Sequence, residues 1–203
     1  MSLRNKAAIV GVGCCKFGEN WDRSEEDMIV DAAYEAYADA GIDDPNKQID
    51  AIYCGSLYSK NGPVEVSESL KLYKPLTSVL NYCATGTEAV RAAAMSIAAG
   101  VYETVLVVGY DKPKDRGVSG PSVNIRDVRS LPATPAGWFA VCAQPYFERY
   151  GASREHLARI AVKNHHNGSL APKSFLKKRI TVEEALNGRM ISWPFGLYDC
   201  AAQ

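Results

Sequence analysis

The sequence of 203 residues lacks several features that would each indicate a particular class of protein. It contains no run of about 18 apolar residues, so a transmembrane helix is not expected. Its first residues have no hydrophobic stretch of the kind that a secretory signal needs. Its formal net charge is zero, which gives no general attraction to nucleic acid or to an anionic membrane surface. We therefore expect a cytoplasmic protein that binds neither nucleic acid nor membrane.

The cysteines lack the spacing of a metal site or of a disulfide framework. The six of them stand at positions 14, 15, 54, 83, 142 and 200, and no two form a Cys-x-x-Cys pair. This distribution favours free thiols in a reducing compartment. A lone cysteine among apolar residues is most often a small core residue. We expect that role for Cys14, Cys15, Cys54 and Cys142.

The first 112 residues alternate between two kinds of hydrophobic pattern. Short apolar runs at 6–13, 49–58, 76–83 and 103–112 predict strands, and segments with helical spacing at 24–41 and 86–100 predict helices. Ser24 is the expected N-cap of the first helix, and Gly41 is its expected C-cap. Strands that alternate with helices favour an α/β fold with a mixed, largely parallel sheet.

Beyond residue 112 the pattern changes. Residues 113–137 are rich in Gly, Pro, Ser and Arg and have no clear period, which is typical of a long functional loop. Helical patterns return at 138–151, 153–168 and 181–188. Bases dominate from residue 154 to residue 179, and the pattern suits either a solvated helix face or a site for an anionic ligand.

Cys83 occupies an unusual position in the stretch NYCATGTEAV (Asn81–Val90). It stands where an apolar strand pattern ends and an alanine-rich helix pattern begins. A thiol at a helix start lies near unpaired backbone N–H groups and the positive end of the helix dipole, and both favour the thiolate. The same N–H groups can stabilise negative charge on an intermediate. Position alone therefore makes Cys83 a candidate nucleophile, with a small core residue as the alternative.

The segment around Cys83 resembles the nucleophile segment of the thiolase superfamily. There Asn-x-Cys-(Ala/Ser)-(Ser/Thr)-Gly opens a central helix that is followed by a core strand, and Asn81, Cys83, Ala84, Thr85 and Gly86 match. The resemblance is to sterol-carrier-protein-2-like thiolases of bacteria and archaea, and it also includes AAIVGVGCCKFG, FAVCAQPYFERYGASREHLARIAVKNHHNG and ISWPFGLYDCAAQ. It implies an N-terminal thiolase-like α/β half at 1–112, with a central helix starting near Cys83. A helical loop region at 113–190 and a return toward the core at 191–203 would follow.

The resemblance implies an acyltransferase that cleaves a 3-oxoacyl-CoA, or runs the reverse Claisen condensation, through an acyl-thioenzyme on Cys83. No bound cofactor is expected, and coenzyme A is the co-substrate. The loop region would shape the acyl-CoA site. Candidate residues for substrate or CoA binding are Lys163, Asn164, His165, Asn167, Lys177, Lys178 and Arg179, the last three because bases bind phosphate strongly. Aromatic residues at 58, 138, 139, 146 and 147 either line a pocket for a bulky or aromatic acyl group, as in lipid or aromatic acid metabolism, or belong to the core.

The resemblance covers only the first half of a thiolase and its loop region. The family's catalytic histidine lies in the second half, and neither His156 nor His165 nor His166 matches its motif. We expect this chain to be incomplete alone, either as a fragment or with the other half in a partner. The resemblance further implies a homodimer or larger oligomer and a small partner with a zinc ribbon and an OB-fold; no metal site is expected here. The alternatives are a thiolase-fold retro-aldolase that acts on a CoA ester, and a non-catalytic acyl-CoA-binding or assembly subunit.

Overall fold

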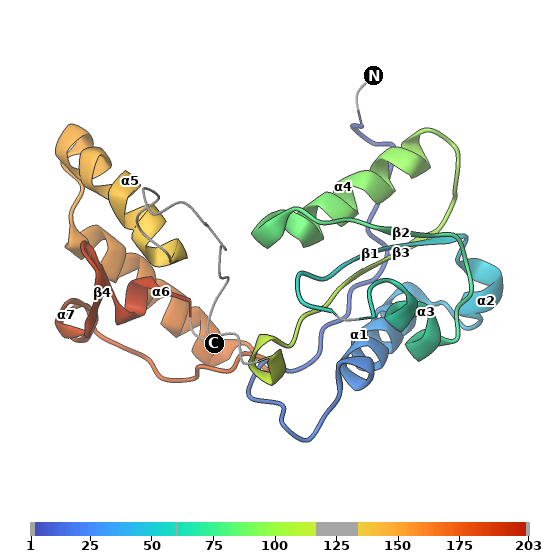
Figure 1. Cartoon of the computed structure of the whole chain (residues 1–203), viewed down its shortest axis with the longest axis horizontal. Helices are drawn as coiled ribbons and strands as arrows, with labels where there is room; N and C mark the ends of the chain where they lie inside the picture. Colours follow the sequence, from blue (N-terminus) through green and yellow to red (C-terminus); the bar gives the residue numbers. More distant parts are fainter. Residues whose placement is uncertain (1–2, 60, 117–133, 202–203) are drawn as a thin grey trace. The chain divides into compact units, whose positions relative to one another are not determined.

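The computed structural model describes residues 3–59, 61–116 and 134–201, and the chain divides into two compact units (Figure 1). The first unit is Met1–Lys112, and the second is Pro113–Gln203. Most of the irregular excursion predicted at 113–137 falls outside the described residues. The role predicted for 113–190, a loop region around an acyl-CoA site, stays a prediction.

A three-stranded parallel sheet forms the centre of the first unit. Its strands are β1 (Ala51–Gly55), β2 (Leu76–Ser78) and β3 (Val105–Gly109), in the order β2-β1-β3. Each lies within a run that the sequence predicted to be a strand, and each is shorter than that run. Because all three run in one direction, their C-terminal ends meet at one edge of the sheet, which we call the carboxyl edge.

Helices cover both faces of this sheet. The helices are α1 (Glu25–Ala40), α2 (Pro45–Gln48), α3 (Val64–Leu70) and α4 (Thr85–Ala98). In Figure 1, α4 lies on one side of the strands, and α1 and α3 lie on the other. The main core lies between the sheet and the pair α1 and α3; its buried members are Ile29, Ala33, Tyr37, Ile49, Ile52, Cys54, Val66, Leu70, Leu72, Leu106 and Val108. Burial of each large aliphatic side chain contributes roughly 1.5–3 kcal/mol.

The ends of α1 agree with the sequence prediction. The Ser24 hydroxyl accepts a hydrogen bond from Asp27 N at 3.1 Å, and Ser24 N donates to the Asp27 carboxylate at 3.0 Å. This capping box satisfies backbone donors that the first turn leaves free. At the other end Gly41 adopts a left-handed conformation with φ 69° and closes the helix.

The opening segment, residues 7–13, differs from the prediction of a buried strand. It is extended but belongs to no sheet, and Ile9, Val10 and Val12 are exposed. The prediction was wrong because carboxylates of α1 bind backbone donors of this part of the chain: Val12 N donates to Asp39 at 2.9 Å, and Cys14 N donates to Glu35 at 2.7 Å.

The second unit is mainly helical. It contains α5 (Pro135–Tyr150), α6 (Arg154–Leu170), α7 (Val182–Asn187) and the antiparallel pair β4 (Met190–Ser192) and β5 (Phe195–Gly196). The three predicted helices are confirmed in type. A small core of Ala158, Ala161, Ile180 and Ala185 holds α6 and α7 together. The pair β4 and β5 belongs to this unit, and the return of 191–203 toward the first unit's core stays a prediction.

A paired set of glycine variants tests how closely the sheet meets α4. A Cβ atom on Gly55 would lie 2.2 Å from Thr85 Cγ2 and 3.0 Å from Val79 O, whereas one on Gly109, its partner in register, would meet nothing within 4 Å. Gly55→Ala is expected to destabilise the chain by about 1–3 kcal/mol, and Gly109→Ala by nearly nothing. Urea midpoints of the two variants check this; equal midpoints would contradict it.

Tyr37 gives a pH-dependent prediction. Its hydroxyl is buried and lacks a hydrogen-bond partner among the described residues, so Tyr37→Phe is expected to cost nothing or to stabilise by about 1 kcal/mol at neutral pH. Burial raises the pKa of Tyr37 from 10.0 to about 12. The unfolded state therefore loses this proton first, and stability falls as the pH rises from about 10 to about 12.

Denaturation at several pH values measures this slope. The Tyr37→Phe variant should lose less stability above pH ~10 than the parent chain. Tyr82→Phe is the matched control, because it also removes one phenol from the first unit, but that side chain is exposed and does not act on Tyr37. The same alkaline slope in the parent and in Tyr37→Phe would refute the assignment.

Candidate functional site

Cys83 lies on the carboxyl edge of the sheet, in a short 3-10 turn (η1, Tyr82–Ala84) that runs directly into α4. The turn is held by Thr85: its hydroxyl accepts a hydrogen bond from Asn81 N at 2.8 Å and donates one to Tyr82 O at 2.7 Å. Tyr82 has φ 46°, which is uncommon for a residue with a side chain. The sequence placed Cys83 at the helix start; the structure places it in the turn just before.

The side chain of Cys83 is exposed, unlike that of Cys54 on the adjacent strand. Cys54 is a core residue as predicted, and burial raises the pKa of its thiol to about 11. Cys14 and Cys15 are half-buried. The prediction of a core position for Cys142 was wrong, because α5 turns that residue to the surface of the second unit.

The chain that leads into this turn lies beside the end of β1. Val79 N donates to Cys54 O at 2.9 Å, so the chain that follows β2 stays beside the end of β1. The absence of a side chain on Gly55 lets the buried Thr85 approach β1. The ends of β1 and β2 and the start of α4 are thus packed into one corner.

Asp111, two residues after β3, fixes the same loop from the other side. Its carboxylate accepts hydrogen bonds from Ser56 Oγ at 2.7 Å, from Leu57 N at 3.1 Å and from Tyr58 N at 2.9 Å. Hydrogen bonds to an ionised acceptor are about twice as strong as neutral ones. One carboxylate therefore sets the backbone path that presents Tyr58.

A second carboxylate, Glu65 at the start of α3, secures the far end of the loop. It is 5% exposed and accepts hydrogen bonds from Ser59 Oγ at 2.5 Å and from Tyr110 Oη at 3.4 Å. Tyr110 Oη also lies 2.9 Å from Gly62 O. The loop from Ser56 to Ser59 is consequently held at both ends by polar contacts.

Tyr58 and Asp111 are residues of this corner that the sequence reasoning did not assign to catalysis. A signal was available, because each lies at the C-terminal end of a run predicted to be a strand, and side chains at the C-terminal ends of parallel strands gather at one edge. What the sequence did not give is the order of the strands, which brings the end of β3 beside the end of β1.

The predicted binding residues gather in the second unit. Lys163, Asn164, His165 and Asn167 belong to α6, and the chain after α6 runs back along it: His165 Nδ1 lies 2.8 Å from Lys178 O, and Arg179 Nε donates to Ser169 Oγ at 3.1 Å. Lys178 forms an ion pair with Glu184 at 3.0 Å, and Lys177 contacts Ala171 O. Lys177, Lys178 and Arg179 are exposed and form what we call the basic segment of the second unit, and Lys163 of α6 is exposed as well.

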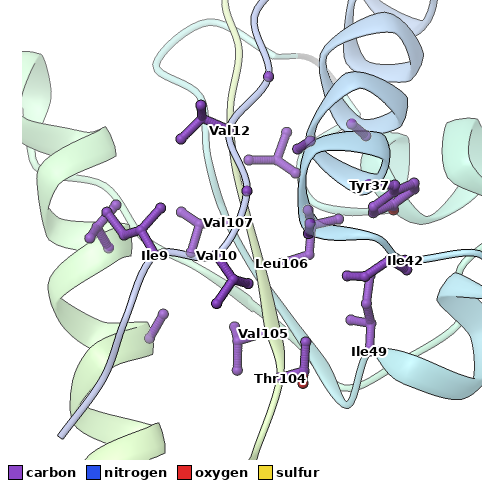
Figure 2. Close-up of a pocket in the computed structure, with 18 of the residues that line it drawn as sticks. Ile9, Val10, Val12, Tyr37, Ile42, Ile49, Thr104, Val105, Leu106 and Val107 are labelled. Carbon is purple, nitrogen blue, oxygen red and sulfur yellow. The ribbon is translucent and has the colours of Figure 1, made fainter.

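A cavity is found among the described residues of each unit. In the first unit, a cavity of about 550 Å³ lies between the opening segment, α1, α4 and β3 (Figure 2). Its lining is mostly aliphatic, and Figure 2 shows Ile9 and Val10 beside Val105 and Val107 of β3. Cys83 does not line this cavity.

The cavity of the second unit, about 590 Å³, lies along α5 and α6. Three of the aromatic residues that the sequence suggested for an acyl pocket line it, namely Phe139, Tyr146 and Phe147; Tyr58 and Trp138 do not.

Within the described parts of the chain, no cluster of three His, Cys, Asp or Glu side chains is arranged to hold a metal ion. None of the helices described has the length and apolar character needed to cross a bilayer.

Comparisons with known proteins agree with this architecture. Residues 7–188 match the family model described as thiolase, N-terminal domain. An acetyl-CoA acetyltransferase of Methanothermobacter thermautotrophicus is 32% identical over 205 residues, covering 96% of this chain and 53% of the relative. The benzoylsuccinyl-CoA thiolase subunit BbsB of Thauera aromatica is 30% identical, with 98% of this chain and 53% of that protein covered.

A solved structure described as Ltp2-ChsH2(DUF35) aldolase superposes with a TM-score of 0.81 and 29% identity, covering 100% of this chain and 54% of that one. The expected thiolase-like α/β fold is thereby confirmed, and so is the likeness to an N-terminal half. The chain spans about half the length of the curated relatives that it matches. It belongs to the thiolase N-terminal domain family.

Proposed function

We propose that the protein containing this chain is a CoA-dependent acyltransferase of the thiolase type, with Cys83 as the nucleophile. The observation that carries the proposal is the exposed Cys83 thiol in the turn before α4, locked in place by Thr85. The first turn of a helix of 14 residues supplies backbone donors next to that thiol. A nucleophile beside fixed N–H groups suits acyl transfer, because the same groups stabilise negative oxygen in the transition state.

The first half of the reaction is a carbon–carbon cleavage. The Cys83 thiolate attacks the ketone carbon of a 3-oxoacyl-CoA, a carbon–sulfur bond forms, and a carbonyl electron pair moves onto oxygen. When that pair returns, the bond from the former ketone carbon to its neighbour breaks. The electron pair leaves on the shortened acyl-CoA, which takes up a proton, and the acyl group stays on Cys83 as a thioester.

The second half regenerates the thiol. The thiolate of free CoA attacks the thioester carbon, a new carbon–sulfur bond forms, and the bond to Cys83 breaks, so that the sulfur of Cys83 leaves as a thiolate. Run backwards, the two halves make a Claisen condensation. We propose that the acid–base groups that move the protons, including the family's catalytic histidine, lie outside these residues.

The basic segment is our proposed contact for the phosphates of CoA. Lys177, Lys178 and Arg179 follow one another and are exposed, as a site for a flexible polyanion requires. His165 lies beside the Lys178 backbone, which links the α6 candidates Lys163, Asn164 and Asn167 to this segment. The aromatic lining of the second unit's cavity supports a bulky acyl group.

A retro-aldolase that acts on a CoA ester is the second candidate. The superposition with a solved aldolase over the whole of this chain favours it. The family resemblance implies that such enzymes do not depend on the nucleophilic cysteine, so the Cys83 corner favours acyl transfer. A covalent acyl adduct distinguishes the two.

We also propose a partner and a location. BbsB is named as a subunit, and the aldolase is named together with ChsH2(DUF35), which supports an assembly with a second protein. That this protein is small and carries a zinc ribbon and an OB-fold is what the family resemblance implies. A homodimer or larger oligomer and a cytoplasmic location complete the proposal.

Intact-protein mass spectrometry of the natural protein after incubation with an acyl-CoA tests the nucleophile. We expect an acyl mass increment that peptide mapping places on Cys83, and we expect Cys83→Ala to remove the increment and the turnover, by at least about a thousandfold, while the fold is kept. The same spectrum gives the mass of the natural chain, which can be compared with the 22.1 kDa of these 203 residues.

Cys200→Ala is the matched control, because Cys200 is also a free thiol but belongs to the second unit and does not line the cavity proposed for the acyl group. It should acylate as the parent does. Turnover retained in Cys83→Ala, or an increment on Cys142 alone, would overturn the acyltransferase assignment. CoA-ester cleavage without any adduct would favour the aldolase.

Charge removal tests the basic segment. The double variant Lys178→Ala and Arg179→Ala is expected to weaken CoA binding about tenfold at low salt, and less at high salt because ions screen exposed charges. The double variant Lys47→Ala and Lys71→Ala in the first unit, where these lysines pair with Asp44 and Glu68, also removes two exposed charges and should leave CoA affinity unchanged. Calorimetric titration with CoA measures both; equal affinities would contradict the assignment.

A further inference from the structure

Helix α6 of the second unit has a histidine at a position where an acid or its amide is usual. His156 is the third residue of α6, and its side chain binds the backbone N–H of the cap Ser153, as in a capping box. The residue that usually makes this contact is glutamate or glutamine. A carboxylate there also suits the positive end of the helix dipole. A histidine lacks that charge, so its imidazole at this position points to a second role.

The contact with Ser153 determines which ring nitrogen of His156 carries the proton. Ser153 N donates a hydrogen bond to His156 Nδ1 at 3.1 Å, and Ser153 Oγ lies 3.0 Å from the same nitrogen. A backbone N–H can only donate, so Nδ1 is the acceptor and carries no proton. The proton of the neutral ring is therefore on Nε2. Among the described residues, this Nε2–H group has no hydrogen-bond acceptor.

The same imidazole lines the cavity of the second unit. Because Nδ1 is bound to Ser153, Nε2 is the polar atom of the ring that is left for a ligand. The volume of about 590 Å³ lies within the range of roughly 300–1,000 Å³ that is typical of ligand pockets. Five more aromatic rings line the cavity, namely those of Phe139, Tyr146, Phe147, Tyr150 and Phe195. The wall thus combines flat apolar surfaces with one donor held in a fixed orientation.

Several of these rings are open to solvent. Phe139, Tyr146 and Tyr150 are 67%, 56% and 61% exposed, and Ile160 in the same wall is 51% exposed. Large apolar side chains that are exposed together around a hollow usually mark a binding site. The rings of Tyr146 and Tyr150 pack against each other with their centroids 4.7 Å apart. Since aromatic rings pack well against other aromatic rings, the ligand that suits this hollow is itself aromatic.

We propose that the cavity of the second unit binds an aromatic group that carries an acceptor oxygen, and that His156 Nε2–H donates the hydrogen bond that recognises this oxygen. His156 is then the specificity-determining residue of the site. The inference rests on the proposed function and deepens it, because it names the class of acyl group: an aryl ring with a carbonyl or other acceptor oxygen, rather than a plain alkyl chain.

Two substitutions of His156 separate recognition of the ligand from capping of the helix. Glutamate and glutamine both complete the capping box with Ser153, so α6 should keep its first turn in each variant. His156→Gln retains a side-chain N–H donor, whereas His156→Glu offers only acceptors. The probes are acetophenone and ethylbenzene, which have the same ring and nearly the same shape, and of which only acetophenone has an oxygen.

Cys142 reports whether the cavity is occupied, because it is an exposed thiol that lines it. The natural protein is treated with iodoacetamide at increasing concentrations of each probe, and peptide mapping gives the concentration that halves the rate at Cys142. Relative to ethylbenzene, about fivefold more acetophenone should be needed in His156→Glu than in the parent, because one hydrogen bond is lost. His156→Gln should behave as the parent does. Cys200, a free thiol outside this cavity, should not be protected.

Three results would overturn the proposal. The first is a ratio of the two probe concentrations that is the same in the parent and in His156→Glu. The second is a Cys142 rate that neither probe lowers. The third is protection of Cys142 that increases with protein concentration and not with the probes, which would show that a second copy of the chain covers the hollow.

Nitrogen NMR of ring-labelled histidine tests the proposal on the parent chain, in case the variants fold poorly. The neutral His156 ring should be the Nε2–H tautomer, and acetophenone, but not ethylbenzene, should move its Nε2 signal. His166 is the internal reference, because it is an exposed residue of α6 that does not line the cavity. An Nδ1–H tautomer, or an Nε2 signal that acetophenone leaves in place, refutes the assignment.

Failure of this inference and failure of the proposed function give different results. An acyl adduct on Cys83, together with a probe ratio that does not depend on residue 156, leaves the nucleophile standing and removes the role of His156. A probe ratio that depends on His156, with no acyl adduct on the natural protein, keeps the aromatic site and removes the acyltransferase.

Discussion

Thr85 of α4 packs closely against Gly55 at the end of β1, and the rest of the corner depends on this packing. A Cβ atom on Gly55 would lie only 2.2 Å from Thr85 Cγ2 and would prevent it. This packing lets α4 begin directly against the sheet. Thr85, buried there, can then bind both Asn81 N and Tyr82 O and hold the turn that carries Cys83. The missing side chain of Gly55 thus sets the distance between the sheet and α4, and that distance determines where the Cys83 thiol lies.

Two carboxylates complete the arrangement by holding loops rather than by packing. Asp111 accepts hydrogen bonds from the backbone N–H groups that follow β1. Glu65 accepts hydrogen bonds from the hydroxyls of Ser59 and Tyr110 at the other end of the same loop. The donors to Asp111 all belong to the loop after β1, whereas the donors to Glu65 come from that loop and from Tyr110 after β3. The loop, α3 and the end of β3 therefore constrain one another. This explains how a short surface loop can present Tyr58 in one direction without a large core beneath it.

The sequence predicted what depends on local pattern. The α1 caps Ser24 and Gly41, the helical type of α1, α4, α5, α6 and α7 and the strands β1 and β3 follow from periodicity and capping chemistry, whereas α2 and α3 were not predicted. It failed at residues 7–13, where an apolar run looks like a strand but the α1 carboxylate of Asp39 binds Val12 N and that of Glu35 binds the next residue, Cys14. Strand order is not a local property, and for that reason the partnership of Asp111 with the Tyr58 loop was not foreseen.

Cys54 and Cys83 are buried to different extents, and this difference determines which of the two thiols is more easily oxidised. Oxidants act on the thiolate, so Cys54, which is sealed in the core and has its pKa raised to about 11, is protected, whereas Cys83 is exposed. Peroxide would convert Cys83 to its sulfenic acid long before it reached the core. Damaged molecules would keep their fold and pass a folding assay, and only a chemical measurement on the Cys83 sulfur would reveal them.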